Sequence, residues 1–475
     1  MKPILLPILL AVAIAIPTVF SEEKPNFIVI FCDDLGYNDI GPFGSKLHRT
    51  PHLDRMAAEG RVFTSFYSTS GVCSPSRSSL MTGCYPKRIG LHQNETGAWV
   101  LFPGNKTGLN PSEITVAEVL KEKGYATACV GKWHLGDQPE FLPTKQGFDS
   151  YFGIPFSNDM GELDRPKGKY PPLPLLRNET VIEEEPDQRL ITQRYTEEAL
   201  QFIEENHEDP FFLYLPHTMP HWPQYSSARF EGKSANGAWG DTVEEIDWST
   251  GQILDKLEQL GIDERTLVLF TSDNGGATRH GASNFPLAGA KGSTMEGGQR
   301  VCMVARWPGK IPAGTKCDAV TSTMDLLPTF ASLAGTDVPT DRTIDGFDIS
   351  SLLQGEANAE SPYEAFYYYF RGNLEAVRVG PWKLHLPKPP RQKNKGGSTP
   401  IQLFHLGNDI GESVNVSDDH PGIVQKLEEW AEKARQDLGD DAKGMDGGDV
   451  RPPGLVDQAA PLTRAHPQSP AGSSQ

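Results

Sequence analysis

Short apolar runs alternate along this chain with segments whose apolar positions recur at helical spacing. The runs predict β-strands at residues 26–32, 125–130, 211–215, 266–271 and 301–306. Their continuous apolar character is typical of strands that are covered on both faces. The segments between them predict helices at residues 51–60, 112–124, 195–206 and 241–260. This alternation predicts an α/β fold in which helices sandwich a large mixed, mainly parallel sheet.

The pattern changes near residue 361. Residues 365–370, 376–386 and 402–406 predict antiparallel strands, and residues 422–438 predict one helix. We therefore expect a larger domain at residues 25–360 and a C-terminal α+β subdomain at residues 361–439. Residues 440–475 are rich in Gly, Asp, Pro, Gln and Ser, which predicts a disordered tail.

The N-terminus has the pattern of a secretory signal peptide. Lys2 precedes an apolar run that ends at Phe20, and polar residues follow from Ser21. A membrane anchor is the alternative, but the run is short and contains three prolines. We expect residues 1–21 to be cleaved and the protein to be periplasmic, secreted or lysosomal, depending on the host. No other stretch is long and apolar enough to span a bilayer, so no membrane association is expected after cleavage.

The chain has 475 residues and a formal net charge of −18. This acidity argues against nucleic acid as a partner, because phosphate binding requires a basic surface. An anionic substrate would also be repelled at long range, so its site must be a local cationic pocket. Six cysteines are too few for a disulfide framework. Cys302 and Cys317 are candidates for one bridge, whereas Cys32 and Cys129 are expected to pack as small hydrophobic residues.

Acidic and amide side chains follow two of the predicted strands. Asp33 and Asp34 come after the first strand, and Asp273 and Asn274 come after the strand at 266–271. Ligands of parallel sheets bind beyond the carboxyl ends of the strands, so these oxygens should meet at one edge. Each Asp alone reads better as a turn cap, but two pairs in equivalent positions favour a site for Ca²⁺ or Mg²⁺.

Basic groups follow other strands. Lys132 and His134 come after the strand at 125–130, His221 follows the strand at 211–215, and Lys291 precedes the strand at 301–306. Individually, such residues are more often surface lysines or loop histidines. Together with Arg77 they form the cationic pocket that the net charge requires.

Cys73 begins the stretch C-S-P-S-R at residues 73–77. Ser74 and Pro75 resemble an N-cap and a first helical position, which places residue 73 at a helix N-terminus, where anions are stabilised. The alternatives are a buried structural cysteine or a thiolate nucleophile. A thiolate is a poor partner for a hard cation, whereas an oxygen nucleophile can be activated by one. This mismatch favours modification of Cys73.

Seven motifs in a fixed order resemble the type I sulfatase family, of the arylsulfatase A and N-acetylgalactosamine-6-sulfatase kind. They are D-D-L-G-Y, C-S-P-S-R with L-M-T-G, G-K-W-H-L-G, G-I-P-F-S, M-P-H-W-P, S-D-N-G-G and K-G-S-T-M-E-G-G, between residues 33 and 298. The resemblance runs from about residue 25 to residue 438. It implies an alkaline-phosphatase-like fold and oxidation of Cys73 to formylglycine by a formylglycine-generating enzyme.

The resemblance also implies a role for each candidate residue. The residues that resemble the ligands of one Ca²⁺ ion, with residue 73 completing the shell, are Asp33, Asp34, Asp273 and Asn274. Arg77 would hold the formylglycine hydrate, and Ser157 resembles a serine near that hydrate. Lys132 and Lys291 would bind sulfate oxygens. His134 would assist breakdown of the covalent intermediate, and His221 with Lys291 would protonate or stabilise the leaving alcohol. Cys84 departs from the pattern, because relatives usually carry a basic residue there.

These features predict a sulfuric ester hydrolase that releases inorganic sulfate, with a sulfated carbohydrate as the expected substrate. The formylglycine hydrate would attack sulfur in line, with the cation and basic residues stabilising the developing charge. Two alternatives remain open. One is a phosphate or phosphonate ester hydrolase that shares the fold and the nucleophile. The other is a non-catalytic sulfoglycan-binding protein in which Cys73 stays unmodified.

Overall fold

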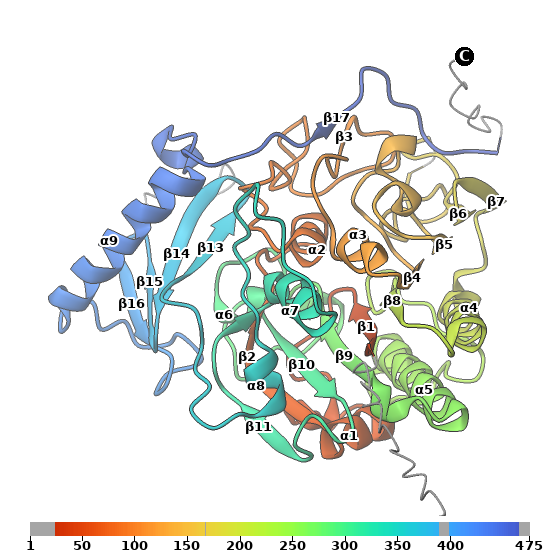
Figure 1. Ribbon diagram of the computed structural model, residues 1–475. Coiled ribbons are helices and arrows are strands. Elements are labelled where there is room, and N and C mark those ends of the chain that lie inside the picture. The colour runs from red at the N-terminus through yellow and green to blue at the C-terminus, as the bar shows by residue number, and fades with distance from the viewer. Residues whose placement is uncertain (1–23, 167, 389–398, 465–475) are drawn as a thin grey trace, which may run out of the picture.

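Two sheets of very different size make up the protein (Figure 1). The computed structural model describes residues 24–166, 168–388 and 399–464. An 11-stranded sheet forms the centre, and a separate 4-stranded sheet covered by one long helix lies beside it. This arrangement confirms the predicted fold class. The signal peptide expected at residues 1–21 lies outside the described residues.

The central sheet is mixed. Its strands are β1 (Asn26–Cys32), β2 (Arg61–Tyr67), β4 (Ala126–Val130), β5 (Ser150–Gly153), β6 (Pro174–Arg177), β7 (Thr180–Glu184), β8 (Phe211–Pro216), β9 (Thr266–Ser272), β10 (Arg300–Arg306), β11 (Thr315–Cys317) and β12 (Thr321–Ser322). Their order is β11-β2-β10-β9-β1-β8-β4-β5-β6-β7, with β12 beside β2. The five strands from β9 to β5 run parallel. β10 runs antiparallel to both of its neighbours.

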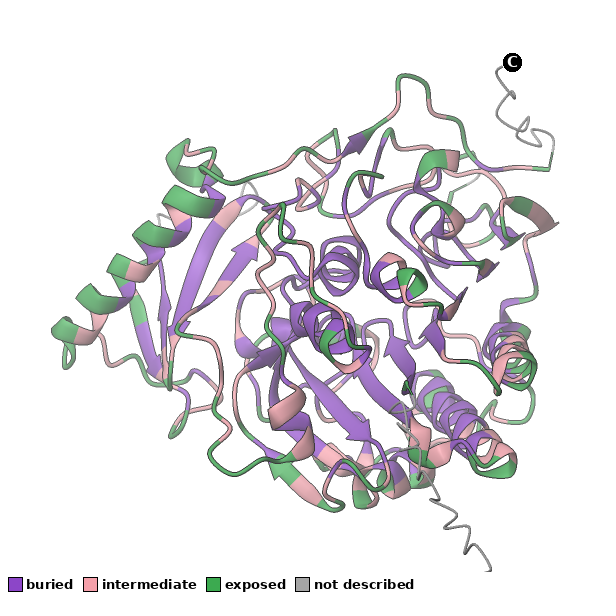
Figure 2. Cartoon of the chain, viewed as in Figure 1, coloured by how far each residue is buried: buried purple, intermediate pink, exposed green. Residues whose placement is uncertain are grey.

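Helices cover both faces of this sheet. They are α1 (Pro51–Ala58), α2 (Cys73–Thr82), α3 (Val116–Glu122), α4 (Ile191–Asn206), α5 (Gly237–Leu260), α6 (Glu296–Gln299), α7 (Leu326–Leu333) and α8 (Ser350–Gln354). Alternate residues of β1 enter two hydrophobic cores: Phe27 and Phe31 pack with α2, α3 and α7, whereas Ile28 and Ile30 pack with α1, α4 and α5. The strands β1, β8, β9 and β10 are accordingly buried along their whole length, whereas the edge strand β7 is not (Figure 2).

Several helix starts differ from the expectation, and α4 and α5 each begin four positions earlier than expected, at Ile191 and Gly237. α3 begins at Val116 rather than at Ser112, because Thr115 and Glu118 form a capping box. α2 begins at Cys73 itself, with Val72 as its N-cap, so that Ser74 and Pro75 lie inside the first turn. The prediction that residue 73 lies at a helix N-terminus is confirmed.

The C-terminal subdomain matches its predicted elements. β13 (Phe366–Phe370), β14 (Asn373–Val379), β15 (Trp382–His385) and β16 (Gln402–His405) form the antiparallel sheet, and α9 (Pro421–Leu438) packs on it. Residues 440–464 differ from the expected disordered tail, since they return along the larger domain. There β17 (Gly454–Leu455) pairs with β3 (Thr107–Gly108). Residues 465–475 lie outside the described part of the chain.

All six cysteines are buried and free. The expected bridge between Cys302 and Cys317 is wrong, because β2 lies between their strands β10 and β11. Two strand spacings separate the residues by about 10 Å, beyond the reach of a disulfide.

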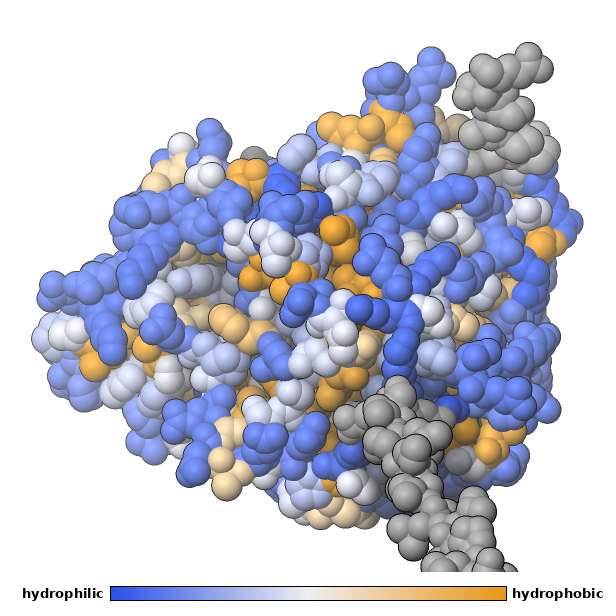
Figure 3. All heavy atoms as spheres, in the orientation of Figure 1, coloured by the Kyte–Doolittle hydropathy of each residue, from blue (hydrophilic) through white to orange (hydrophobic). Residues whose placement is uncertain are grey.

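Hydrophilic residues dominate the face of the molecule shown in Figure 3, in keeping with the charged composition. Within the described ranges, no helix has both the length and the apolar character needed to cross a membrane.

Candidate active site

Five neighbouring parallel strands end at one edge of the sheet, and each is followed by a candidate residue. In sheet order, β9 is followed by Asp273 and Asn274, β1 by Asp33 and Asp34, β8 by His221, β4 by Lys132 and His134, and β5 by Ser157. The helix α2 adds Cys73 and Arg77, and the loop before α6 adds Lys291. The topology therefore gathers every candidate of the sequence at one place, as the strand-end rule requires.

The carboxylates form a compact cluster suited to a cation. Oxygens of Asp33, Asp34 and Asp273 lie within 4.8 Å of one another, and all three residues are buried. Asn274 Nδ2 donates to Asp34 Oδ1 at 2.8 Å, while Asn274 Oδ1 is buried and has no hydrogen-bond partner among the residues that the structure describes. A buried amide oxygen without a partner is costly, and a bound cation would satisfy it. The donor set thus fits a hard divalent ion such as Ca²⁺.

Three fixed cations face these three carboxylates. Lys132 Nζ lies 2.5 Å from Asp33 Oδ2, and Lys291 Nζ lies 2.7 Å from Asp34 Oδ2. Arg77 donates to Asp273 Oδ2 through Nε and Nη2, at 3.0 and 2.8 Å. Charge within the cluster is balanced before any ion or substrate binds. A divalent cation would therefore leave the site net positive, as an anionic ester requires.

The two central carboxyls have opposite pKa shifts. Burial raises the pKa of Asp33, but Lys132, His221 and Arg77 outweigh burial and hold this pKa well below its usual range. Burial and the neighbouring Asp33 raise the pKa of Asp273 to about 7. Carboxylates this close repel one another unless positive charge separates them, which is a further reason to place a cation here.

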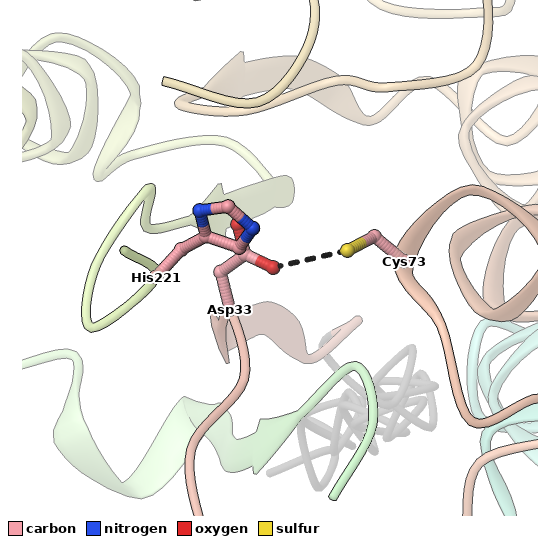
Figure 4. A group of neighbouring side chains, drawn as sticks. All are labelled: Asp33, Cys73 and His221. Carbon is pink, nitrogen blue, oxygen red and sulfur yellow. Dashed lines mark hydrogen bonds between the residues drawn. The ribbon is translucent and has the colours of Figure 1, made fainter. Parts of the chain in front are cut away.

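Cys73 points into the cluster from the start of α2. Its Sγ lies 3.4 Å from Asp33 Oδ1, with His221 on the other side of the same carboxylate (Figure 4). Burial, followed by the charge of Asp33, raises the pKa of the Cys73 thiol. The thiol is thus protonated at neutral pH and is a weak nucleophile as it stands.

Within the described residues, one ring nitrogen of His134 has a hydrogen-bond partner and the other has none. Its Nε2 lies 2.9 Å from the carbonyl oxygen of Leu101, and because a carbonyl can only accept, Nε2 carries the proton. Nδ1 is buried without a hydrogen-bond partner. Burial and Lys132 hold the pKa of His134 well below its usual range, so the ring is neutral and Nδ1 can accept a proton.

Asn158 is a functional residue that the sequence did not reveal. Its Nδ2 donates to Gln188 Oε1 and to the carbonyl of Pro223, both at 3.0 Å, which turns Oδ1 toward His221. His221 Nδ1 donates to that oxygen at 3.0 Å, leaving Nε2 3.7 Å from Asp34 Oδ2. Asn158 therefore fixes the orientation of His221. Its position directly after Ser157 was the available signal.

Backbone geometry at two strand ends is strained. Asp34 and His134 adopt left-handed conformations, with φ of 68° and 61°. Such conformations in non-glycine residues cost energy and concentrate at functional sites. Gly131 precedes Lys132 with φ 138°, and a Cβ there would lie 1.9 Å from the carbonyl oxygen of Pro216. Only glycine allows this turn to carry Lys132 back over the sheet edge.

A cavity of about 560 Å³ opens above these residues. Asp34, Cys73, His134, Ser157, His221 and Lys291 form its floor. Lys132 Nζ donates to Ser157 Oγ at 2.7 Å, which ties the floor to the loop after β5. Aromatic side chains of Trp99, Phe102, Tyr170 and Trp222 form the walls. The cavity has the size of a site for one or two sugar rings.

Cys84, the departure from the expected pattern, has a basic neighbour after all. Arg451, from the segment after α9, places Nη2 3.3 Å from Cys84 Sγ and pairs with Glu113 at 2.7 Å. A guanidinium group 367 positions away in the sequence thus occupies the place beside this cysteine. The basic group near position 84 is thus provided by Arg451 and not by residue 84 itself.

The site lies at the carboxyl edge of a mainly parallel sheet and combines a buried acid cluster with opposing cations and a residue at a helix N-terminus. These features are those expected of a hydrolase that acts on anionic esters. A profile described as Sulfatase matches residues 25–336. N-acetylgalactosamine-6-sulfatase of Mus musculus is 40% identical over 438 residues, covering 84% of this chain and 83% of that protein. Arylsulfatase A of Homo sapiens is 38% identical over 451 residues, covering 86% and 87%. The chain belongs to the sulfatase family, and it is an enzyme that hydrolyses sulfate esters.

Solved structures agree with this assignment. The crystal structure of Ps i-CgsB in complex with k-i-k-neocarrahexaose has a TM-score of 0.75 and 32% identity, and covers 86% of this chain and 92% of that chain. The phosphonate monoester hydrolase of Agrobacterium radiobacter, at 17% identity, has a TM-score of 0.61 and shares the fold alone. The fold is therefore the alkaline-phosphatase-like fold of the sulfatases.

Proposed function

We propose that this sulfatase removes sulfate from a sulfated carbohydrate, with formylglycine formed from Cys73 as its nucleophile. One Ca²⁺ ion would be held by residue 73 together with Asp33, Asp34, Asp273 and Asn274. The family implies a metal ion and a modified cysteine. The observation that carries the proposal is the position of Cys73 Sγ, buried and 3.4 Å from Asp33, in a site otherwise made of oxygen ligands.

Modification changes what residue 73 can do. As formylglycine hydrate it would supply an attacking oxygen and, through its second hydroxyl, a route for releasing sulfate. The ion would polarise the ester and neutralise charge on its sulfate oxygens. Arg77 is held against Asp273 and against the carbonyl of Lys132, at 2.8 Å in each case, so its position beside residue 73 is rigid.

The surrounding residues divide the remaining tasks. Lys132 and Lys291 bind sulfate oxygens as fixed positive charges. His134 accepts a proton from the hydrate at Nδ1, the nitrogen that has no other partner. Burial, then Lys291, lowers the pKa of His221 to about 4, so its imidazole is neutral at neutral pH. Lys291, whose pKa is raised by Asp34 despite burial, is then the proton donor to the leaving oxygen. His221 Nε2, which carries no proton, accepts a hydrogen bond from the leaving alcohol once Lys291 has protonated it.

A carbohydrate substrate is supported by the cavity walls. Trp99, Phe102, Tyr170 and Trp222 line the space above the floor, and flat aromatic faces suit sugar rings. Relatives named for N-acetylgalactosamine 6-sulfate and a structural neighbour that holds a neocarrahexaose point to the same class. The volume of about 560 Å³ exceeds what a sulfate group alone needs.

Mass analysis of the peptide containing Cys73 tests the nucleophile. Protein from its native host, or produced with a formylglycine-generating enzyme, should show the aldehyde at this position, and Cys73→Ala should lose sulfate release altogether. Fully active enzyme with an intact thiol would refute the proposal. The same preparation should contain about one divalent ion per chain by elemental analysis, and mature protein should begin after residue 21 if the chain is exported.

Sulfate release from a panel of sulfated mono- and oligosaccharides tests the substrate class. We expect inorganic sulfate from at least one member, with N-acetylgalactosamine 6-sulfate as the first to try. Rates on matched aryl sulfate and aryl phosphate separate the remaining reaction type, and a preference for the phosphate ester would overturn the assignment. Binding of the glycans without release, by protein from the native host whose Cys73 is still a thiol, would instead identify a non-catalytic binding protein.

A further inference from the structure

The outer wall of the cavity carries a charge that the reaction at its floor does not use. Arg279 lies in the loop after β9 and lines the cavity together with His280 and Trp222. On the opposite side Arg165 lies over the Trp222 ring, with its guanidinium 5.4 Å from the ring centroid. The wall therefore holds two arginines around one aromatic pair, and these arginines differ in their partners.

Arg165 is neutralised and Arg279 is not. Arg165 forms an ion pair with Asp159. Arg279 is exposed, and within residues 24–166, 168–388 and 399–464 it forms no ion pair with a carboxylate. In a protein of net charge −18, an arginine that lines the active-site cavity without an acidic partner is unusual. Its charge is available to a ligand.

The side chain is nevertheless held in place. Arg279 Nε donates to His280 Nε2 at 3.0 Å, so that nitrogen accepts and the imidazole is neutral. Burial and the charge of Arg279 lower the pKa of His280, in agreement with a neutral ring. His280 in turn stacks on Trp222, with ring centroids 5.7 Å apart and planes 26° apart. The guanidinium is thus oriented before substrate arrives, and its terminal nitrogens remain free to bind.

The floor already accounts for the scissile group. Lys132, Lys291 and Arg77 are each paired with a carboxylate there, and a sulfate ester carries a single negative charge. We propose that Arg279 binds a second anionic group of the substrate, a carboxylate or sulfate carried either by the sugar that bears the scissile ester or by the sugar next to it. A planar guanidinium binds both groups through paired hydrogen bonds. This inference rests on the proposed function, since it assumes a sulfated saccharide in the cavity.

Two pairs of substrates that differ by one charge test this subsite. The first pair is a uronyl-N-acetylgalactosamine 6-sulfate disaccharide and its carboxyl methyl ester. The second pair is N-acetylgalactosamine 4,6-disulfate and N-acetylgalactosamine 6-sulfate. The wild-type enzyme should prefer the more anionic member of at least one pair, by about 5- to 20-fold in kcat/KM. The responding pair tells whether the second group is a carboxylate or a sulfate.

The variant Arg279→Gln should abolish that preference by raising KM for the more anionic substrate, with kcat little changed, because the contact is the same in the ground and transition states. The less anionic substrate should be unaffected. Arg279→Lys keeps the positive charge but lacks the paired N–H donors of the guanidinium, and it should retain part of the preference. Lys426→Gln, which removes one positive charge from the exposed side of α9, should leave it intact. High salt should reduce the preference in the wild type.

The outcomes separate the inference from the proposed function. If wild-type enzyme releases sulfate from no member of either pair or of the wider panel, the proposed function fails and the inference fails with it. If the enzyme is active but prefers neither anionic substrate, the inference alone is wrong. An equal loss on both members of a pair in Arg279→Gln would also overturn it, because that result would assign Arg279 to holding His280.

Discussion

Asn158 and His221 show how single hydrogen bonds set the chemistry of this site. An imidazole has two nitrogens, and the partner of one decides what the other can do. Asn158 Oδ1 accepts a hydrogen bond from His221 Nδ1, so the proton of the neutral ring stays on Nδ1 and Nε2 is an acceptor. His134 reaches the complementary result through the carbonyl of Leu101, which leaves Nδ1 free. Both histidines line the cavity, and the unprotonated nitrogen is Nε2 in His221 and Nδ1 in His134.

Replacing Asn158 with Ala should lower kcat about 10-fold or more, because partners that orient an active-site group typically contribute 10- to 100-fold. The expected change is in kcat rather than KM, since His221 would rotate without loss of the sulfate-binding lysines. Steady-state desulfation rates measure this effect. Asn408→Ala, at an exposed loop position, is the matched control.

The same substitution in a His221→Ala background should have almost no further effect on kcat. Two groups that act as one unit are strongly non-additive, and here Asn158 acts only through His221. A full 10-fold loss in that background would show that Asn158 has another role.

The sequence predicted the active-site residues that directly follow strands. It missed Asn158, which acts through a second residue, His221. Asp33, Lys132 and Asp273 could be located because a parallel sheet brings all its carboxyl ends to one edge. The role of Asn158 could not, because its partner His221 lies 63 residues away, with the strands β6, β7 and β8 and the helix α4 between them. The pairing of Cys302 with Cys317 failed for a related reason, since spacing along the chain says nothing of the strand between them.

Among the elements, α6 joins the active site to the small sheet. It begins five positions after Lys291, and its first residue, Glu296, is fully buried. Lys383 of β15 lies between two carboxylates, 2.9 Å from Glu296 and 3.0 Å from Glu412. Glu412 also accepts from the backbone nitrogen of Glu296 at 2.6 Å. The C-terminal subdomain therefore fixes the loop that carries Lys291.

Lys383→Met should destabilise the protein by about 3–5 kcal/mol, the usual cost of leaving a buried carboxylate without its partner. Urea unfolding measures the change. Lys426→Met on the exposed side of α9 should change stability by less than about 0.5 kcal/mol. A loss in Lys383→Met as small as in this control would mean that Arg300, 3.3 Å from Glu296, compensates alone.

This network should also make the protein sensitive to acid. Burial raises the pKa of Glu296 and of Glu412, but Lys383 together with Arg300 and Arg378 at Glu296, and with His385 at Glu412, outweighs burial and holds both pKa values below their usual range. A carboxyl with a lowered folded pKa stabilises the protein above the ordinary Glu pKa of about 4.3, and this contribution is lost as the pH falls below that value. The free energy of unfolding should therefore fall more steeply from about pH 5 to about pH 3 in wild type than in Lys383→Met. Parallel pH curves for the two proteins would contradict this.

The elements themselves were predictable where burial on both faces leaves a continuous apolar run, as in β1, β8 and β9. The strands β6 and β7 were not, because their residues are mixed and the surrounding segment is rich in proline and charge. The start of α3 was placed too early because Ser112 and Thr115 are both good capping residues. Only Thr115 has a glutamate three positions later to complete the capping box.

For the whole molecule, ion pairs around the segment after α9 join α9 to the part of the chain that is built on the 11-stranded sheet. Arg88, in the loop after α2, pairs with Asp345 and Asp437 at 2.7 Å each and with Asp449 at 3.1 Å. Next to it, Arg451 pairs with Glu113. The composition of residues 440–464 resembles a disordered tail, since few of them are apolar. Their order comes from ion pairs with residues more than 300 positions earlier, which no local pattern reveals.

Arg451→Met should therefore lower stability without changing catalysis. Glu113 is buried, with 2% of its side chain exposed, and in the described part of the chain its one remaining ion-pair partner would be Arg342 at 3.8 Å. Because Arg451 itself is partly exposed, we expect a loss of about 1–3 kcal/mol, below that of a fully buried pair. Thermal and urea unfolding measure it, with Lys443→Met at an exposed position as the control. Adding Glu113→Gln should recover part of the loss, since the double variant no longer buries an unpaired charge. A double variant as unstable as the sum of its parts would show that the pair does not couple, and that Arg451 stabilises the fold through Cys84 and the backbone instead.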